Sequence, residues 1–192
     1  MLDMLKMGLK LLLITAVAAL LLGGANILTR DAIDEQERLA SDQARRTVLQ
    51  AERFEQQEVL PEEETGIPGI VEVYAGYNGE ELAGYTVKVR AKGYGGPVEV
   101  TVGYIADRIT GVSISAKDET PGLGAEANKQ AFMDRFKDKS LDQPLQIVKG
   151  GAAADNQVDA ITGATVTSKA VSTAINNASL YFMGVVMGGA AA

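Results

Sequence analysis

Two stretches, GYTVKVRA (84–91) and PVEVTVGY (97–104), carry the pattern that decides the fold of this chain. Valine returns at every second position along both of them, at Val87, Val89, Val98, Val100 and Val102. The residues between the valines are mostly polar or charged, as Lys88 and Arg90 illustrate. Apolar residues with a period of two are typical of β-strands that bury one face. Both stretches are therefore predicted to be strands with their valines turned toward a core.

The neighbouring residues extend this pattern in both directions. The stretch IVEVYAGY (70–77) is followed by Asn-Gly at 78–79, and this dipeptide is a strong hairpin signal. Residues 107–111 (DRITG) are predicted to turn the chain into VSISA (112–116). The whole region is therefore expected to be an antiparallel meander, in which each strand pairs with the next along the chain.

Helical periodicity replaces the alternation toward the C-terminus. A helix is expected at about 126–137, with four residues turned inward: Ala127, Ala131, Phe132 and Phe136. A strand is expected at 145–150, and a last helix from Ser168 to about Met183. The core residues of this last helix are expected to be Val171, Ala174, Ile175, Ala178, Tyr181 and Phe182. The predicted fold class is α+β: a largely antiparallel sheet with flanking helices, preceded by one N-terminal transmembrane helix.

The N-terminal segment has the composition of a membrane span. Residues 7–28 are apolar apart from three polar side chains, and a helix needs about 20 such residues to cross a bilayer. Lys6 and Lys10 come first, so the positive-inside rule places the N-terminus in the cytoplasm. Residues 1–29 are therefore predicted to be a single-pass anchor in the cell (inner) membrane, with the C-terminal domain extracytoplasmic or periplasmic. A cleaved signal peptide is the alternative, but the long apolar run favours an anchor.

Between the anchor and the predicted sheet, residues 31–57 are rich in helix formers and charged residues. They are predicted to form one helix with a solvated face, and Asp31 can cap its start. Residues 59–69 (VLPEEETGIPG) are expected to be a linker. The chain is thus divided into an anchor at 1–29, a helical stalk and linker at 30–69, and a folded domain at 70–192.

The composition removes several kinds of chemistry. The chain has 192 residues, a net charge of −7, no cysteine and no histidine. It can therefore form no Cys/His zinc site, no cysteine-held iron–sulfur cluster and no Ser-His or Cys-His catalytic pair. The acidic balance argues against nucleic acid as a partner, because affinity for phosphates depends on Lys and Arg. Any electron transfer would need an organic cofactor, and no metal site and no catalytic residue are expected in this chain.

The stretch DAITGATVTS (159–168) sets four hydroxyl groups just before the last predicted helix. One of them is expected to cap that helix, and the candidates are Thr167 and Ser168. The free N–H groups and the dipole of a helix N-terminus also favour an anion such as phosphate. A reversible site for a phosphorylated ligand, with Lys169 adding positive charge, is therefore one functional interpretation.

The same stretch resembles the flavinylation motif of the FMN-binding domain family. That motif has Asp, two residues, Ser or Thr, Gly-Ala, Thr or Ser, one residue, and a further Ser or Thr. The matching positions are Asp159, Thr162, Gly163, Ala164, Thr165 and Thr167. The resemblance implies that Thr165 carries covalent FMN through its phosphate, and that a separate flavin transferase makes this bond from FAD. The cofactor-binding residues that it implies in this stretch are Thr162, Gly163, Ala164, Thr165, Thr167 and Ser168, and residues 70–192 would be the FMN-binding domain.

A second stretch, ETPGLGA (119–125), matches a loop of the same family. Taken alone, it is expected to be a Pro-Gly turn before the next helix. The resemblance implies that it lies against the flavin, through Glu119, Thr120, Gly122 and Leu123. The stretch KGYGGP (92–97) also resembles the family, but it is expected to act mainly as a glycine-rich connection between strands.

Within the family, the short length and the single N-terminal span are most similar to the G subunits of Rnf-type ion-translocating ferredoxin:NAD⁺ oxidoreductases. The resemblance implies an electron-relaying flavoprotein with other membrane and redox subunits as partners. The complex, rather than this chain, would then be the enzyme. Three alternatives stay open: the related C subunit of a Na⁺-translocating NADH:quinone reductase, a non-covalent extracytoplasmic module for a phosphorylated ligand, and an anchor without a cofactor.

Overall fold

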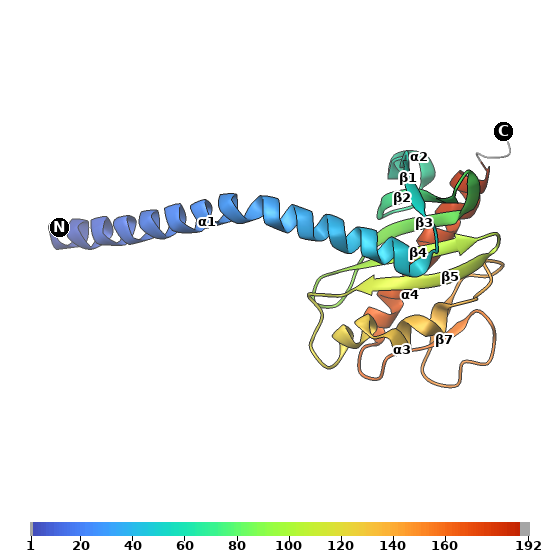
Figure 1. Ribbon diagram of the computed structural model, residues 1–192. Helices are drawn as coiled ribbons and strands as arrows, with labels where there is room; N and C mark the ends of the chain where they lie inside the picture. The colour runs from blue at the N-terminus through green and yellow to red at the C-terminus, as the bar shows by residue number, and fades with distance from the viewer. Residues whose placement is uncertain (1, 189–192) are drawn as a thin grey trace. The chain divides into compact units, whose positions relative to one another are not determined.

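The computed structural model describes residues 2–188 and divides into two compact units, 1–42 and 43–192 (Figure 1). Met1 of the predicted anchor and the last four residues of the predicted FMN-binding domain lie outside the described residues. The helix α1 (Leu2–Val48) runs through the first unit and ends in the second.

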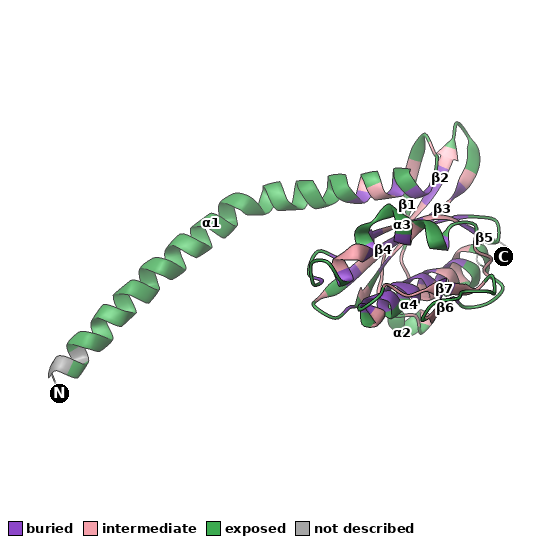
Figure 2. Cartoon of the chain, turned by 90° about the horizontal axis from the view of Figure 1, so that it is seen from below, coloured by how far each residue is buried: buried purple, intermediate pink, exposed green. Residues whose placement is uncertain are grey.

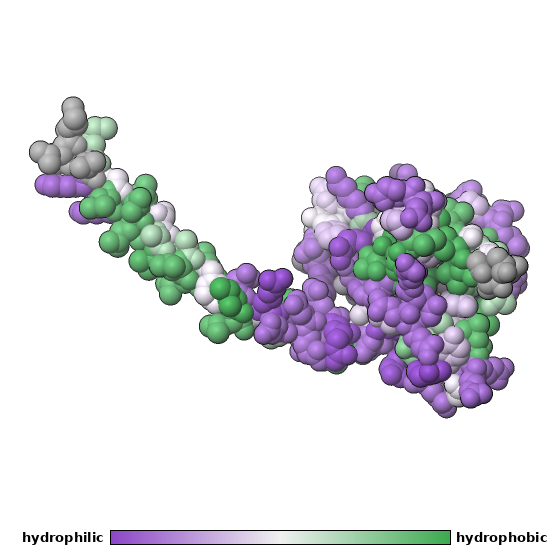
Figure 3. All heavy atoms as spheres, turned by 90° about the horizontal axis from the view of Figure 1, so that it is seen from above, coloured by the Kyte–Doolittle hydropathy of each residue, from purple (hydrophilic) through white to green (hydrophobic). Residues whose placement is uncertain are grey.

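The first unit is helical, and its described side chains are almost all exposed (Figure 2). From Lys6 onward it is long and apolar enough to cross a bilayer, and none of its most apolar window is buried. Figure 3 shows hydrophobic side chains along its N-terminal part and hydrophilic ones after them. Such a helix fits the predicted membrane anchor, and a signal sequence near an N-terminus also meets these criteria of length and hydropathy.

The expectation of one helix over 31–57 is wrong, because α1 ends at Val48. The residues that follow form the strand β1 (Arg53–Gln57), which pairs with β2 (Ile70–Asn78) in antiparallel register. Helix propensity is a weak preference, and the backbone groups of β1 find partners along the edge of the sheet instead. The predicted linker at 59–69 contains one short helix, α2 (Glu62–Thr65).

The predicted meander is confirmed. A five-stranded sheet has the order β1-β2-β3-β4-β5, and the remaining strands are β3 (Glu81–Lys92), β4 (Pro97–Ile105) and β5 (Arg108–Ser115). All four neighbouring pairs are antiparallel. The Asn78-Gly79 hairpin forms as predicted, and Gly79 has the positive φ of 61° that such a turn requires. The turn between β4 and β5 consists of Ala106 and Asp107, and β5 begins at Arg108. The predicted turn at 107–111 is therefore too long, because most of it belongs to β5.

The valines of the two central strands form the core, as their alternation predicts. Val87 pairs with Val102 and Val89 with Val100, and all four are fully buried. The helix α4 (Thr165–Tyr181) packs on this face of the sheet, as Figures 1 and 2 show. Its predicted core residues are buried: Val171, Ala174, Ile175, Ala178, Tyr181 and, one residue beyond its end, Phe182.

An aromatic cluster closes the core near the C-terminal end of α4. The rings of Tyr104 and Phe182 stack with their centroids 4.5 Å apart, and the centroid of the Tyr85 ring lies 5.8 Å from that of Phe182. Burial raises the pKa of the Tyr104 phenol, so its hydroxyl stays neutral and shares a hydrogen bond with the Ser179 hydroxyl. After Tyr181 the helix continues as a π-helical segment, η3 (Phe182–Met187).

The prediction of one continuous helix at 126–137 is wrong, because the segment is broken into three short helical turns. The segment consists of η1 (Gly124–Asn128), α3 (Gln130–Met133) and η2 (Asp134–Phe136), because Lys129 has extended backbone angles. The Asn128 side chain accepts a hydrogen bond from the Ala116 N–H at the end of β5, which fixes the first turn there. Phe132 and Phe136 are buried as predicted, but Ala131 is exposed because the break rotates α3.

The strand predicted at 145–150 is confirmed as β6 (Gln146–Val148). It pairs in parallel with β7 (Gln157–Asp159), which leads directly into the hydroxyl-rich stretch. Within the second unit, the core thus lies between α4 and one face of the large sheet. The small sheet leads directly to the start of α4.

The opposite face of the large sheet receives the last residues of α1 through a set of glycines. The carbonyl oxygen of Val48 accepts a hydrogen bond from the Thr110 hydroxyl, and a Cβ on Gly103 would overlap that carbonyl. The Leu49 side chain lies where a Cβ on Gly76 would come within 2.8 Å of it. The helix end can approach the strands this closely only because these positions lack side chains.

We expect Gly103→Ala to lower the free energy of unfolding by about 1–3 kcal/mol, because the added methyl group overpacks the contact with Val48. Gly184→Ala is the matched control, since nothing lies within 4 Å of its Cβ position; in the helical segment η3 it should leave stability unchanged or raise it by up to about 1 kcal/mol. Urea unfolding of the full chain in detergent, followed by circular dichroism, measures both. Equal unfolding midpoints for the two variants would contradict the close approach.

Candidate functional site

The hydroxyl-rich stretch runs from the last residue of β7 through the loop at 160–164 into the first turn of α4, which begins at Thr165 rather than at the predicted Ser168. The N-cap position belongs to Ala164, which has no side-chain capping bond, so the expectation that Thr167 or Ser168 caps the helix is wrong. Gly163 has a positive φ of 79°, and this lets the chain turn sharply into the first helical residue. The early start places Thr165 at the beginning of a helix of 17 residues.

Ser168 has a structural role inside the first turn. Its hydroxyl donates to the carbonyl oxygen of Ala164 at 2.9 Å and accepts from the Ile161 N–H at 3.0 Å. The side chain is fully buried. Ser168 therefore ties the approach loop to the helix without occupying the cap position.

Thr167 points to a different part of the chain. Its hydroxyl donates to Glu119 Oε2 at 2.8 Å, and both side chains are buried, with Glu119 only 3% exposed. Glu119 is the first residue of the ETPGLGA stretch, which follows β5. This bond therefore joins the two stretches that resemble the flavin-binding family.

The other oxygen of Glu119 holds the glycine-rich stretch between β3 and β4. Oε1 accepts from the Tyr94 N–H at 2.6 Å and from the Gly95 N–H at 3.3 Å. A Cβ on Gly93 or Gly124 would overlap the Glu119 carboxylate. A buried charge needs such partners to offset its lost hydration, and here they come from two other segments, so three segments of the chain meet at Glu119.

These three segments enclose a cavity of about 500 Å³. Its lining consists of Tyr94, Glu119, Thr120, Leu123, Gly124, Gly163, Ala164, Thr165, Val166 and Thr167. Ligand sites in proteins commonly have volumes of this order and combine apolar walls with a few polar groups. The cavity is therefore large enough for a planar aromatic cofactor, with the Thr165 side chain in its wall.

The electrostatics of the cavity favour an anionic group beside Thr165. The first N–H groups of α4 have no partner within the helix, and its first turn contains no acidic residue. The dipole of a long helix adds partial positive charge at this end. A phosphate bound to or near Thr165 would therefore be stabilised by the backbone itself.

Most of the predicted site residues meet at this cavity, and three do not line it. Glu119, Thr120, Leu123, Gly163, Ala164, Thr165 and Thr167 contribute to its wall. Thr162 and Gly122 instead line a neighbouring cleft that also contains Lys129 and Arg135, and Ser168 is buried behind the helix start. Arg135 donates to the carbonyl oxygen of Asp159 at 2.7 Å, which fixes the end of β7. The roles of all these residues toward a flavin stay predictions.

Three residues of the lining were not among the predicted site residues: Tyr94, Gly124 and Val166. Tyr94 belongs to KGYGGP, which was expected to act mainly as a connection between strands. The signal that could have identified it is a single aromatic residue among three glycines, because a large side chain on a tight loop has few neighbours of its own chain to pack against. Val166 lies between two motif positions that carry hydroxyls, so the spacing gave no hint of its contact.

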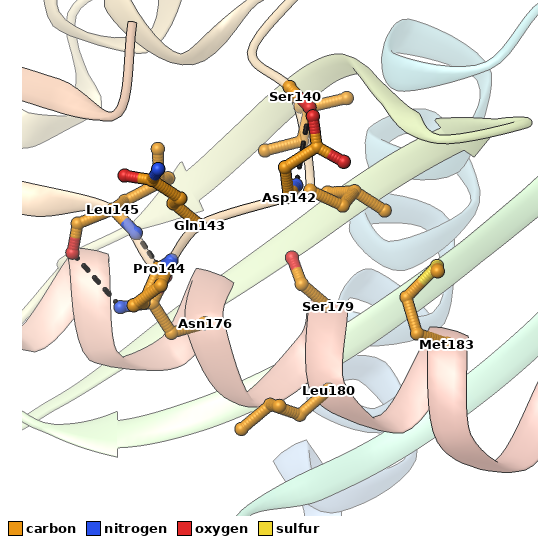
Figure 4. A pocket seen from close by; sticks show the side chains of 11 residues that line it. Ser140, Asp142, Gln143, Pro144, Leu145, Asn176, Ser179, Leu180 and Met183 are labelled. Atoms are coloured by element: carbon orange, nitrogen blue, oxygen red, sulfur yellow. Dashed lines mark hydrogen bonds between the residues drawn. The ribbon is translucent and has the colours of Figure 1, made fainter. Parts of the chain in front are cut away.

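A second cavity of about 380 Å³ lies beside the C-terminal half of α4, with Ile109 of β5 in its wall (Figure 4). Its lining includes Asn176, Ser179, Leu180 and Met183 from α4 and η3, and residues 140–145 from the loop before β6. The Asn176 side chain donates to the carbonyl oxygen of Leu145 and accepts from its N–H. This cavity contains none of the predicted site residues. Among the described residues, 2–188, no group of three or more acidic side chains is placed to hold a metal ion.

Comparison with known proteins gives a consistent result. Residues 93–179 match the FMN-binding domain family. The chain is 40% identical over 182 residues to the G subunit of the Na⁺-translocating ferredoxin:NAD⁺ oxidoreductase complex of Acetobacterium woodii, with 89% of this chain and 87% of that one covered. It is 34% identical over 148 residues to the G subunit of the proton-translocating complex of Clostridium ljungdahlii, with coverage of 77% and 74%.

The fold is also similar to a solved structure, NqrC of Shewanella oneidensis. The TM-score is 0.56, with 24% sequence identity, and the match covers 63% of this chain and 61% of that chain. At this identity the likeness supports the α+β fold with its largely antiparallel sheet.

We expect Thr167→Val to destabilise the protein by about 1–3 kcal/mol, because it leaves a buried oxygen of Glu119 without its hydroxyl donor. Thr173→Val makes the same chemical change at an exposed position of the same helix and should have little effect. Denaturant unfolding of both variants measures the difference. Equal stabilities would contradict the importance of the bond between Thr167 and Glu119.

Proposed function

Since the chain belongs to the family of G subunits of ion-translocating ferredoxin:NAD⁺ oxidoreductase complexes, and contains an FMN-binding domain, we propose that it is an FMN-carrying electron-transfer subunit of such a complex. One observation carries the proposal. Every residue that lines the 500 Å³ cavity falls within the part of the chain that matches the FMN-binding domain.

We propose that the FMN is attached through a phosphate ester to the hydroxyl of Thr165. In this attachment the Thr165 oxygen forms a bond to the phosphorus of the FMN half of FAD. The phosphoanhydride bond breaks, AMP leaves, and the hydroxyl proton is released. A threonine hydroxyl is a weak nucleophile and needs activation, and none of the hydrogen bonds around the site gives Thr165 a carboxylate acceptor. This supports a separate flavin transferase as the catalyst.

The surrounding residues would hold the cofactor in defined ways. The N–H groups in the first turn of α4 would bind the phosphate, while Thr120 can offer a hydroxyl to a polar edge of the ring. Leu123 would supply an apolar wall; it is 43% exposed and lies close to Gly163. The bound flavin supplies the redox chemistry, and the protein orients it and tunes it.

The N-terminal helix would anchor the protein in the membrane that holds the rest of the complex. Lys6 and Lys10 favour a cytoplasmic N-terminus, which would place the flavin domain outside the cytoplasm after a single span. Other membrane and redox subunits would then be its partners in electron transfer.

The C subunit of a Na⁺-translocating NADH:quinone reductase is supported less well as an alternative. The similarity to the C subunit from Vibrio alginolyticus is 43% identity over 60 residues, which covers 28% of this chain and 23% of that one. The similarity to the two G subunits extends over most of both chains.

We expect Thr165→Val to abolish the covalent flavin and leave the fold intact, because Thr165 makes no side-chain hydrogen bond of the kind that Thr167 and Ser168 make. The full chain, co-expressed with a flavin transferase, should gain the mass of FMN less one water. Thr165→Ser keeps the hydroxyl and should gain the same mass, and Thr165→Val should gain none. A Thr165→Val protein that still carries this mass would move the attachment elsewhere, and flavin that is lost on denaturation of the wild type would support a reversible binding module.

We expect Leu123→Asp to lower the reduction potential of the bound flavin, because a carboxylate beside the ring disfavours added electrons. The shift should be of the order of tens of millivolts for a charge a few ångströms away. Leu123→Met keeps the wall apolar and serves as the control. An equilibrium redox titration of both variants measures the shift, and a potential equal to that of the control would remove Leu123 from contact with the ring.

A further inference from the structure

Tyr94 is an aromatic side chain with an unusual position. It is 74% exposed, yet it lies at the wall of the same cavity as Thr165. Large aromatic side chains contribute most when they are buried against an apolar or aromatic partner. Nothing in the hydrogen-bonding pattern requires a tyrosine here, because only its backbone N–H is engaged.

The loop that presents Tyr94 is held tightly. The Gly93 N–H donates to the Gly96 carbonyl oxygen at 2.8 Å, which closes the turn around Tyr94. A Cβ on Gly95 would overlap the carbonyl oxygen of Asp118, and a Cβ on Gly96 would lie 2.5 Å from the Cβ of Asp118. The turn therefore packs directly against Asp118, and a side chain at either glycine position would not fit between them.

Glu119 sets where this loop stands relative to Thr165. One carboxylate oxygen accepts from the Tyr94 N–H, and the other accepts from the hydroxyl of Thr167, two residues after Thr165. The same buried carboxylate therefore fixes the aromatic residue and the proposed attachment residue across one cavity. One carboxylate oxygen thus holds the Tyr94 loop, and the other holds the first turn of α4.

We propose that the ring of Tyr94 lies against the isoalloxazine ring of the bound FMN, and that Glu119 is the positioning residue that holds it there. This inference rests on the proposed function. Tyr94 is the one aromatic residue of the cavity wall, and the flavin ring is a planar conjugated partner of the kind that aromatic side chains stack on. The Tyr94 side chain is exposed in the protein alone, and the bound flavin would cover it.

The test compares Tyr94→Leu and Tyr94→Phe with the wild type, each as the full chain co-expressed with a flavin transferase. Intact mass first establishes that FMN is attached. The bimolecular rate constant for iodide quenching of the flavin fluorescence, which is the Stern–Volmer constant divided by the fluorescence lifetime without iodide, then reports how accessible the ring is to solvent. We expect Tyr94→Leu to raise the iodide quenching constant about two- to tenfold, the range that an aromatic stacking contact contributes to an equilibrium.

Tyr94→Phe separates stacking from the phenol group. It keeps an aromatic ring, so the iodide quenching constant should stay near the wild-type value. A phenol in contact with a flavin quenches its emission by giving an electron to the excited ring and taking it back. Flavin emission per attached FMN should therefore rise in Tyr94→Phe and in Tyr94→Leu alike.

The outcomes distinguish this inference from the proposed function. Attached FMN with the same iodide constant in Tyr94→Leu and the wild type would overturn the stacking while the flavin site stands. A wild-type chain that gains no FMN mass would overturn both.

Two variants of Glu119 test its positioning role. Glu119→Gln keeps the size of the side chain but loses the charge that three donors share. Its amide oxygen can still accept from the N–H groups of Tyr94 and Gly95 while its NH2 donates to the Thr167 hydroxyl, so Glu119→Gln is the conservative control and should keep the wild-type iodide constant. Glu119→Leu removes both acceptor oxygens, and we expect it to load FMN and to raise the iodide constant toward that of Tyr94→Leu. The double variant of Glu119→Leu and Tyr94→Leu should equal Tyr94→Leu alone, because Glu119 acts through Tyr94. An unchanged iodide constant, effects that add, or a loss of FMN loading in Glu119→Leu would each overturn the positioning role.

Discussion

The buried carboxylate of Glu119 joins three parts of the chain that are distant in sequence. It accepts hydrogen bonds from the N–H groups of Tyr94 and Gly95 and from the hydroxyl of Thr167. A charge that is 3% exposed is costly unless its oxygens are satisfied, so the three segments must keep these positions together. The glycines at 93 and 124 follow from the same constraint, because a side chain at either position would occupy the space of the carboxylate.

The rest of the second unit supports this junction. The valines of β3 and β4 bury one face of the sheet against α4, and this packing fixes the N-terminal end of α4 beside the ends of β3 and β5. The last turn of α1 lies on the opposite face of the sheet through Val48 and Leu49. The loops that carry function are therefore held by packing on both sides of the sheet, in agreement with the usual role of a rigid scaffold under binding loops.

The parts of the fold that follow from periodicity could be predicted, and those that depend on distant contacts could not. The alternation at 84–104 predicted the central strands, and the apolar spacing of α4 predicted its buried face. The strand at Arg53–Gln57 was missed, because its sequence favours a helix and only the pairing with β2 makes it extended. The break at Lys129 was missed for a similar reason, since it depends on the bond between Asn128 and Ala116.

The candidate site shows the same division. The motif spacing identified the hydroxyl-rich stretch and the ETPGLGA loop, and the structure brings both to one cavity. The start of α4 was predicted three residues too late, because the hydroxyls that resemble caps make other bonds: Thr167 to Glu119, and Ser168 to the preceding loop. Tyr94 was not included at all, since its place beside Thr165 depends on a tertiary bond to Glu119 that no local pattern reveals.

These bonds also leave Thr165 distinct among the four hydroxyl residues of the stretch. Thr167 and Ser168 are buried and engaged, and Thr162 lines a different cleft. Cleavage after Lys149 and Lys169 with trypsin releases residues 150–169, a peptide that contains all four hydroxyls. Tandem mass spectrometry of this peptide, taken from the full chain co-expressed with a flavin transferase, should place the mass of FMN less one water on Thr165. The same mass on Thr162, Thr167 or Ser168, or on any other peptide of the protein, would contradict the account.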